Sequence, residues 1–391
     1  MRYRALTWDH PRGYNALAAA AAGLDEARDG LAPDLAIDWD KQPLEGFEAH
    51  PIGDLCARYD LIVLDHPHVG EAVAERGLIP LEDLFTAGDI AGWQRDSIGP
   101  SLASYRFADR HWALPLDAAT QVTACRADLL DGPIPVTWAE VASLSERAPV
   151  ALSLAGPHAC LTFLSMAAAF GDPPAVADPD RLVSAKVGTQ VLDLMATLAG
   201  RMPAAVRGLN PIGLLGHMAR TDDVTLCPLV YGYVNYAAPT ASDEKPLTFA
   251  DAPRATAGGR PGSTLGGTGI GVSVRCEVTP ALLDHLRWLL GAEAQRSFIP
   301  AHDGQPSRRD AWADEAVNAR WGGFYRNTAA TLEAAYVRPR HAGYIAFQAD
   351  AAAMIRDALA DGTPHTALLD RLQHRYAASR PDTSGPGGAE R

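Results

Sequence analysis

The chain has 391 residues, of which 47% are hydrophobic and 21% charged, and its formal net charge is −13 at pH 7. It exceeds the size at which a single hydrophobic core stops growing, so we expect two domains. The acidic balance argues against nucleic acid or an anionic membrane surface as a partner, because either would require a basic face, whereas a neutral or cationic small molecule is easier to accommodate.

The first third of the sequence alternates short apolar strands with a helix. Strands are predicted at 3–7, 36–39 and 61–64, and the alanine-rich stretch 15–27 is predicted to be helical. Its alanine run is followed too soon by charged residues to span a bilayer, so no membrane insertion is expected. The alternation predicts an α/β fold that contains a parallel sheet.

Polar side chains follow two of these strands. Trp8, Asp9 and His10 come after the first strand, and Asp65 and His66 come after the third. Ligands of parallel sheets lie beyond the carboxyl ends of the strands, so these residues are candidates for a binding site. Their carboxylates and imidazoles suit hydrogen bonds to a polar ligand and equally suit proton transfer.

No metal or cofactor site is predicted. The spacing of His66 and His68 is compatible with a metal, but no orienting partners can be identified for them. The five cysteines are odd in number and widely spaced, which argues against both a zinc site and a disulfide framework. Buried thiols are therefore expected at Cys56, Cys125, Cys160, Cys227 and Cys276.

A strand is predicted for 112–117, and beyond it the sequence pattern differs from that of the first third. A second lobe is expected to begin near Asp117. Within 133–148, Thr137 is the expected N-cap of a helix, with Glu140 at the capping-box position. Further helices are predicted at 161–170, 186–198 and 213–219. A strand at 225–230 then leads into the aromatic segment that holds Tyr231, Tyr233 and Asn235.

The run 265–273 is rich in glycine. It does not fit a dinucleotide fingerprint, because the glycine spacing differs and the run leads into a strand instead of a helix. Its glycines permit close approach of the backbone. The N–H of Gly267 and the hydroxyl of Thr268 are candidates for ligand contact, and a tight hinge turn is the alternative.

The last third is predicted to be mostly helical. Helices are expected at 280–290, 310–318, 328–335, 345–359 and 366–377, followed by a flexible tail at 379–391. No secretory leader precedes the first strand. We therefore expect a cytoplasmic location for the chain as written, and a periplasmic or cell-surface location if a signal peptide has been removed.

Several sequence segments, in the order in which they occur along the chain, resemble those of a known protein family. They are the segments 113–117, 135–140, 266–273, 298–308 and 338–344. The chain resembles the extracellular solute-binding proteins of ABC importers, family 1, the maltose or sugar-binding type, although it lacks the usual signal peptide. The resemblance implies a two-lobed, type II periplasmic-binding-protein-like α/β fold, with parallel-rich sheets flanked by helices and a helical C-terminal region.

The resemblance also implies lobe boundaries, hinges and a ligand cleft between the lobes. Lobe 1 would comprise 1–116 and 266–305, and lobe 2 would comprise 117–262 and 310–378. Hinges are expected near 116–120, 258–266 and 301–309. The partners implied are a small polar molecule in the cleft and, if the protein is exported, an ABC permease.

Most of the candidate residues have two possible roles. The aromatic rings can stack on a ligand or simply pack in the core, and Asp117 and Gln121 can touch a ligand or brace the crossover. His158 is expected in a solvated loop, with ligand contact as the alternative. Arg338 and Arg340 are expected to tie down the helical segment. The predicted ligand-binding residues are Trp8, Asp9, His10, Asp65, His66, Asp117, Gln121, Tyr231, Tyr233, Asn235, Gly267 and Thr268.

Two functions are compatible with this sequence. The first is a solute-binding protein that closes its two lobes around a sugar-like or other polar metabolite. The second is a cytoplasmic enzyme on the same scaffold, with His10, Asp65 and His66 as its acid and base groups. No motif for a named reaction is present, so the sequence leaves open whether the protein is an enzyme.

Overall fold

The computed structural model describes residues 1–28 and 35–380. The last helix ends at Ser379, and the remainder of the predicted tail, 381–391, lies outside the described residues.

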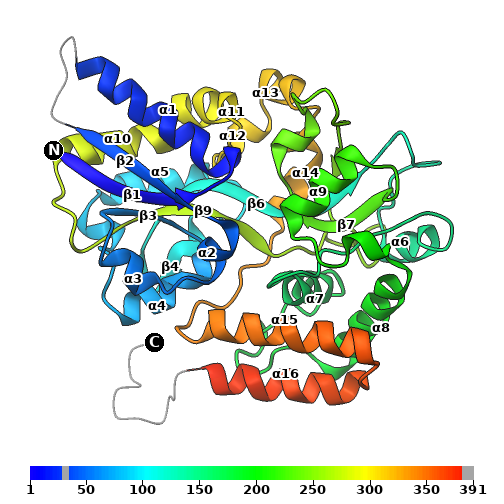
Figure 1. The fold of residues 1–391 in the computed structure, drawn as a ribbon. Coiled ribbons are helices and arrows are strands. Elements are labelled where there is room, and N and C mark those ends of the chain that lie inside the picture. The colour runs from blue at the N-terminus through cyan, green and yellow to red at the C-terminus, as the bar shows by residue number, and fades with distance from the viewer. Residues whose placement is uncertain (29–34, 381–391) are drawn as a thin grey trace.

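The strands of the described chain form one large mixed sheet and a small hairpin (Figure 1). In the large sheet the order is β2-β1-β3-β9-β6-β7, with β8 pairing with β6, and β4 and β5 form the hairpin. Parallel pairing joins β1 to β2 and to β3, whereas β9, β6, β7 and β8 pair antiparallel. The bounds are β1 (Arg2–Trp8), β2 (Ala36–Gln42), β3 (Leu61–Leu64), β4 (Arg106–Phe107), β5 (Arg110–His111), β6 (Leu114–Cys125), β7 (Leu226–Tyr231), β8 (Thr248–Ala250) and β9 (Leu265–Val272).

Strand β6 carries the chain from one half of the sheet to the other. Its first part, from Leu114 to Thr120, pairs with β9, and its second part, from Gln121 to Cys125, pairs with β7 and β8. All of its residues are buried. The strand predicted for 112–117 therefore begins two residues later and continues to Cys125, because its polar side chains find partners inside the protein.

Long helices cover both faces of the sheet. The expected helix at 310–318 is divided into α12 and α13, because the Asp314 side chain accepts hydrogen bonds from the N–H groups of Ala316 and Val317 and starts a new helix. The main helices are α1 (Pro11–Arg28), α2 (Leu44–Ala49), α3 (Ile52–Cys56), α4 (Val69–Ala74), α5 (Ala87–Asp96), α6 (Trp138–Leu144), α7 (His158–Ala169), α8 (Ala185–Arg201), α9 (Pro211–Arg220), α10 (Pro280–Leu290), α11 (Ile299–Ala301), α12 (Arg309–Trp312), α13 (Glu315–Arg320), α14 (Phe324–Glu333), α15 (Tyr344–Asp361) and α16 (His365–Ser379). Short single turns include η1 (His66–His68) and η5 (Val234–Ala237).

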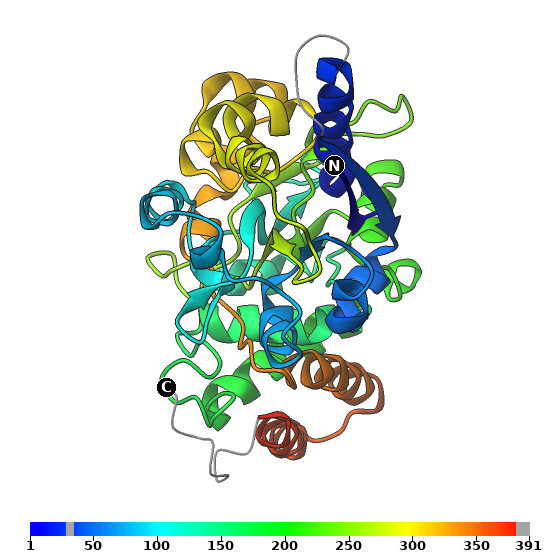
Figure 2. The same cartoon turned by 90° about the vertical axis from the view of Figure 1, so that its left-hand side faces the viewer.

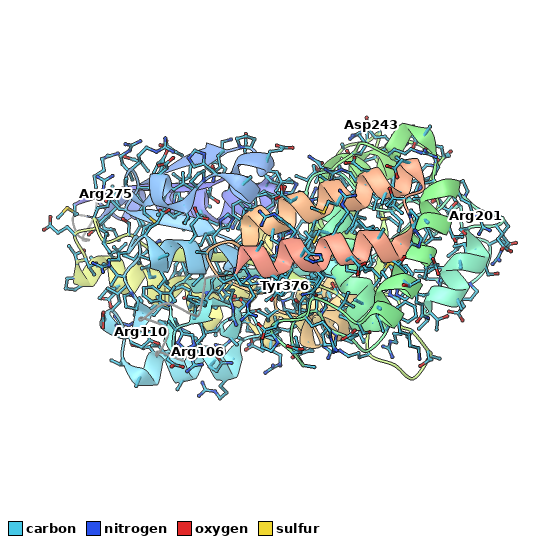
Figure 3. All side chains as sticks on the ribbon, turned by 90° about the horizontal axis from the view of Figure 1, so that it is seen from below. Arg106, Arg110, Arg201, Asp243, Arg275 and Tyr376 are labelled. Atoms are coloured by element: carbon cyan, nitrogen blue, oxygen red, sulfur yellow. The ribbon has the colours of Figure 1, made fainter. Side chains whose placement is uncertain are left out.

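The helices gather into two masses on either side of the middle of β6 (Figure 1). On one side α1 and α10 lie over the β1–β3 region, with α3 and α4 on its opposite face; on the other side α6 to α9 and α14 surround β7. The turned view in Figure 2 shows the C-terminal pair α15 and α16 below the rest of the molecule. Figure 3 looks onto this pair from below, where α15 packs on α7 and α16 packs on α8.

The core explains why β3 is apolar along its whole length. Leu61 and Val63 join the main hydrophobic cluster, whereas Ile62 and Leu64 point to the opposite face and join a second cluster beneath α3 and α4. Successive side chains of a strand point to opposite faces, so a strand covered on both faces must be apolar throughout. Among the described residues, none of the helices has the length and apolar character needed to cross a bilayer.

Gly267 allows β9 to approach β6 closely. Its φ is +93°, and a Cβ at this position would lie 2.3 Å from the Asp117 carbonyl oxygen. We expect Gly267→Ala to lower the free energy of unfolding by about 2 kcal/mol or more, because it adds both backbone strain and a steric clash. The measurement is urea denaturation followed by circular dichroism.

Gly200→Ala is the matched control, since a Cβ there meets nothing within 4 Å. It lies in α8, where alanine is intrinsically favoured over glycine, so this variant should be neutral or slightly more stable. Equal stability of the two variants would contradict the close approach of β9 to β6.

Candidate functional site

A cavity, partly open to solvent, lies between the two masses of helices. On one side its walls come from the end of β1, from α2 and from η1. On the other side they come from the start of α7 and the end of β7, and β9 and α15 complete the lining. The cavity is therefore built from segments that are far apart in the sequence.

Half of the predicted binding residues line this cavity. They come from the ends of β1 and β7, from the residue before η1, and from β9. Those residues are Trp8, Asp65, Tyr231, Tyr233, Gly267 and Thr268. The structure thus brings together strand ends that the sequence singled out, and their contact with a ligand remains a prediction.

The other predicted residues are not among those that line the cavity. The Asp9 side chain is 60% exposed and pairs with Lys41 at 2.7 Å. Asn235 lies in η5, beyond the part of the aromatic segment that reaches the cavity. Gln121 is fully buried in a network in which its side chain bonds Thr162, Ser165 and Thr264. Of the two readings for Gln121, the structure favours bracing of the crossover.

Asp117 forms a buried ion pair with Arg12 across the core. The Arg12 Nε donates to Asp117 Oδ1 at 3.0 Å, and the Arg12 Nη2 donates to the other carboxylate oxygen. A third bond runs from Arg12 Nη1 to the Gly232 carbonyl oxygen at 3.2 Å. The guanidinium also lies 5.0 Å from the ring centroid of Tyr233. This one side chain joins α1 to β6 and to the segment after β7, and it lines the cavity.

A second buried ion pair joins Asp65 to Arg338. The Arg338 Nη2 donates to Asp65 and to the Leu265 carbonyl oxygen, and its Nη1 donates to Gln348 at 3.0 Å. Burial by itself would raise the pKa of Asp65, but the positive charge of Arg338 holds that pKa well below its usual range. Asp65 is thus kept ionised. Arg338 ties down the segment before α15, as expected, and in addition it lines the cavity.

The imidazoles of this region are buried, and their pKa values are depressed. Burial lowers the pKa of both His66 and His68 to about 4, with a contribution from the charge of Arg338. Burial and the nearby Arg12 lower the pKa of His10 to about 3. His10 stacks on Trp8 with 5.1 Å between ring centroids, and neither its ring nor that of His66 lines the cavity. These histidines are neutral hydrogen-bonding groups at pH 7.

The expectation of a solvated loop for His158 is wrong. His158 begins α7, is 2% exposed and lines the cavity, with its Nε2 at 3.3 Å from Oε1 of Glu48. The preceding Gly-Pro pair suggested a loop, but the loop turns directly into a buried helix whose residues all face the protein interior. Arg340 behaves as expected and donates to backbone oxygens of 103–106.

Sequence reasoning missed several lining residues, among them Arg12, Phe47, Glu48 and Gln348. Arg12 stands within the polar segment that follows β1, so its position was a usable signal. Phe47 and Glu48 lie in the short helix α2, which has no periodic apolar pattern to reveal it. Gln348 lies in α15, distant in sequence from every strand end, and offered no local signal.

The described residues include no group of three or more His, Cys, Asp or Glu side chains that could hold a metal ion. The five cysteines are free thiols and are buried, as expected. The polar groups that line the cavity can hydrogen-bond a ligand directly, and the aromatic rings can cover its apolar faces.

No protein-family model matches this chain, and no curated protein matches its sequence. Solved structures do match over nearly the whole length. An ABC transporter solute-binding protein from Agrobacterium radiobacter K84, in complex with ribitol, is 20% identical, with 97% of this chain and 98% of that chain covered and a TM-score of 0.77. Maltose-bound MalE3 of T. maritima is 16% identical, with coverages of 96% and 98% and a TM-score of 0.78.

UgpB from Mycobacterium tuberculosis, in complex with glycerophosphocholine, is 15% identical, with coverages of 97% and 98% and a TM-score of 0.75. At these identities the likeness establishes the fold. The chain has the two-lobed fold of ABC transporter solute-binding proteins, and the expected fold class is confirmed.

Removing the acidic partner of Arg12 should destabilise the folded protein. We expect Asp117→Asn to lower the free energy of unfolding by about 3–5 kcal/mol, because it leaves a buried guanidinium without its counter-charge. Asp38→Asn, which breaks the exposed pair with Arg2, should cost about 1 kcal/mol or less. Chemical denaturation of both variants checks the difference, and similar losses would contradict the buried role of Asp117.

The depressed histidine pKa values predict a pH-dependent stability. The pKa is about 4 for folded His66 and His68, against an ordinary value of 6.5, so the unfolded chain binds more protons between these values. The contribution of these two histidines to the free energy of unfolding is fully present above pH 6.5. It decreases as the pH drops toward 4, by about 1.4 kcal/mol per pH unit for each histidine.

Urea denaturation at a series of pH values measures this slope. His68→Gln should make it shallower, whereas His374→Gln, at an exposed ring, should leave it unchanged. An unaltered slope in His68→Gln would show that the pKa of His68 is not depressed.

Proposed function

We propose that this protein is a solute-binding protein that closes two lobes around a small polar ligand, of a sugar-like or polyol-like kind. The observation that carries the proposal is the cavity between the two masses of helices, lined by Trp8, Tyr231 and Tyr233 together with polar groups such as Thr268 and Gln348. Rings that cover apolar C–H faces beside groups that hydrogen-bond hydroxyls suit a polyhydroxylated molecule.

The structural neighbours support this ligand class. The Agrobacterium protein holds ribitol and the T. maritima protein holds maltose, and a neighbour from Thermotoga lettingae holds tagatose. Each of them matches this chain over nearly its whole length. We infer that the cavity of this chain takes a small polar molecule of similar chemistry.

We further propose that lobe 1 comprises 1–116 and 266–305 and that lobe 2 comprises 117–262 and 310–378. The change of partners along β6 near Thr120 supports a hinge at 116–120. The segment 301–309 runs beside this strand, since Ala118 donates its N–H to the Gln305 carbonyl oxygen. Neighbouring crossovers of this kind allow two lobes to rotate about a common line while their own cores remain intact.

The proposal includes an ABC permease as partner and a location outside the cytoplasmic membrane. Delivery of a solute to an importer requires the closed protein to meet the permease on the outer face of the membrane. The location therefore differs from the cytoplasmic one expected for the chain as written. Fractionation of source cells tests it, and a purely cytoplasmic protein would rule out a role in import.

The enzyme alternative is less well supported by the cavity. Of the three acid–base candidates, only Asp65 lines it, and Arg338 keeps that carboxylate ionised. His10 and His66 are buried beside the cavity and lie outside its lining. General acid–base catalysis needs a group that reaches the substrate and exchanges a proton near neutral pH, and these three residues do not meet both conditions.

Calorimetric titration with ribitol, mannitol, maltose, tagatose and glycerophosphocholine tests the binding function. We expect saturable binding of at least one of them, and a weakening of about 1–3 kcal/mol in Trp8→Ala or Tyr233→Ala, because each ring is nearly fully buried at the cavity wall.

The control for these variants is Trp93→Ala, whose ring packs on Phe85 outside the cavity and should not affect affinity. Unchanged affinity in both cavity variants would rule out this cavity as the binding site. Nuclear magnetic resonance of the recovered ligand separates the two functions, since a chemically altered ligand would favour the enzyme.

A further inference from the structure

The permanent positive charges of the cavity wall are already neutralised within the protein. Arg12 is bonded to both carboxylate oxygens of Asp117, and Arg338 is bonded to Asp65. All four side chains are at least four-fifths buried. Neither guanidinium therefore requires an anionic group from a ligand to offset its charge.

Glu48 is the carboxylate of the cavity wall that has no such partner. Its side chain is 21% exposed, and its nearest basic atom is the His158 Nε2 at 3.3 Å. Within the described residues, no hydrogen bond to the Glu48 carboxylate is formed, and both ring nitrogens of the buried His158 also lack a hydrogen-bond partner. An imidazole is not a permanent cation, in contrast to the arginines that face the two aspartates.

The surroundings of Glu48 favour a cationic group from outside. Phe47 and Tyr231 line the same cavity as Glu48, and the Tyr231 ring lies 5.9 Å from the ring of His158. Aromatic faces attract cations as well as apolar groups. The remaining histidine of the wall, His68, has a pKa lowered to about 4 by burial and adds no positive charge at pH 7.

We propose that the cavity selects a polyhydroxylated ligand that carries an amino group, whose ammonium binds the Glu48 carboxylate while its hydroxyls meet the polar wall. The inference rests on the proposed function and narrows its ligand class. Because Glu48 belongs to α2 and His158 to α7, the ammonium would be bound where the two proposed lobes meet.

The test is a matched pair of probes that differ in one group, sorbitol and glucamine, in which an ammonium replaces a terminal hydroxyl. At pH 7.5 an alkyl ammonium is fully protonated. Titration calorimetry should show glucamine binding about tenfold or more tightly than sorbitol, as expected for a charge-assisted hydrogen bond. Glu48→Gln should abolish this preference, so that the ratio of the glucamine affinity to the sorbitol affinity falls to about one.

Glu75→Gln is the control for net charge. Glu75 is exposed and does not line the cavity, so the preference for glucamine should persist in this variant. Equal binding of the two probes by the unaltered protein, or a preference that survives in Glu48→Gln, would overturn the amino-ligand proposal and leave the binding function supported.

If neither probe binds, the amino-ligand proposal is also overturned, and the binding function is decided by the wider panel of sugars and polyols. The comparison of the two probes on the unaltered protein needs no variant. The proposal therefore stays falsifiable even if Glu48→Gln does not fold.

Discussion

The buried ion pair between Arg12 and Asp117 connects three parts of the molecule that are far apart in the sequence. Arg12 belongs to the first helix, Asp117 to the strand that runs through both halves of the sheet, and the third bond of the guanidinium reaches the Gly232 carbonyl oxygen. Buried charges of this kind are tolerated only when each finds its partner. The pair therefore requires α1, β6 and the end of β7 to meet in one geometry, and that geometry forms one wall of the cavity.

The second ion pair, between Arg338 and Asp65, attaches the C-terminal region to the rest of the molecule in a similar way. Arg338 joins the segment before α15 to Asp65 at the end of β3 and to the backbone of β9. Through it, the helical pair α15 and α16 is attached to the cavity wall, although most of its packing is against α7 and α8. The two guanidiniums thus shape the cavity while their charges remain neutralised. The chemistry that the cavity offers a ligand therefore depends on the aromatic rings, the buried histidines and Glu48.

Local features of the fold were predictable because their causes are local. The capping box of Thr137 and Glu140 is formed as expected, with both reciprocal hydrogen bonds present, since it depends on residues three apart. The break at Asp314 was missed, although a capping aspartate followed by a helical segment was visible. The partners of the polar side chains in β6 could not be read from the sequence, because Gln121 and Thr123 form hydrogen bonds with distant segments.

The sequence by itself determined the alternation of strands and helices in the first third, the helical character of the last third, and the strand ends from which Trp8, Asp65, Tyr231 and Tyr233 reach the cavity. The alternation and the helices follow from periodicity, and the positions of Trp8 and Asp65 follow from the rule that side chains just beyond parallel strands gather at one edge of the sheet. Tyr231 and Tyr233 lie at and just beyond the end of β7, which pairs antiparallel, so this rule does not cover them. Only the tertiary structure decided which charges are paired. Asp65 and Arg338 are 273 residues apart, and Arg12 and Asp117 are 105 residues apart. Charge pairing at such separations depends on how the chain folds back on itself. No local pattern therefore distinguishes the two aspartates that pair with arginine from Glu48, which faces the imidazole of His158.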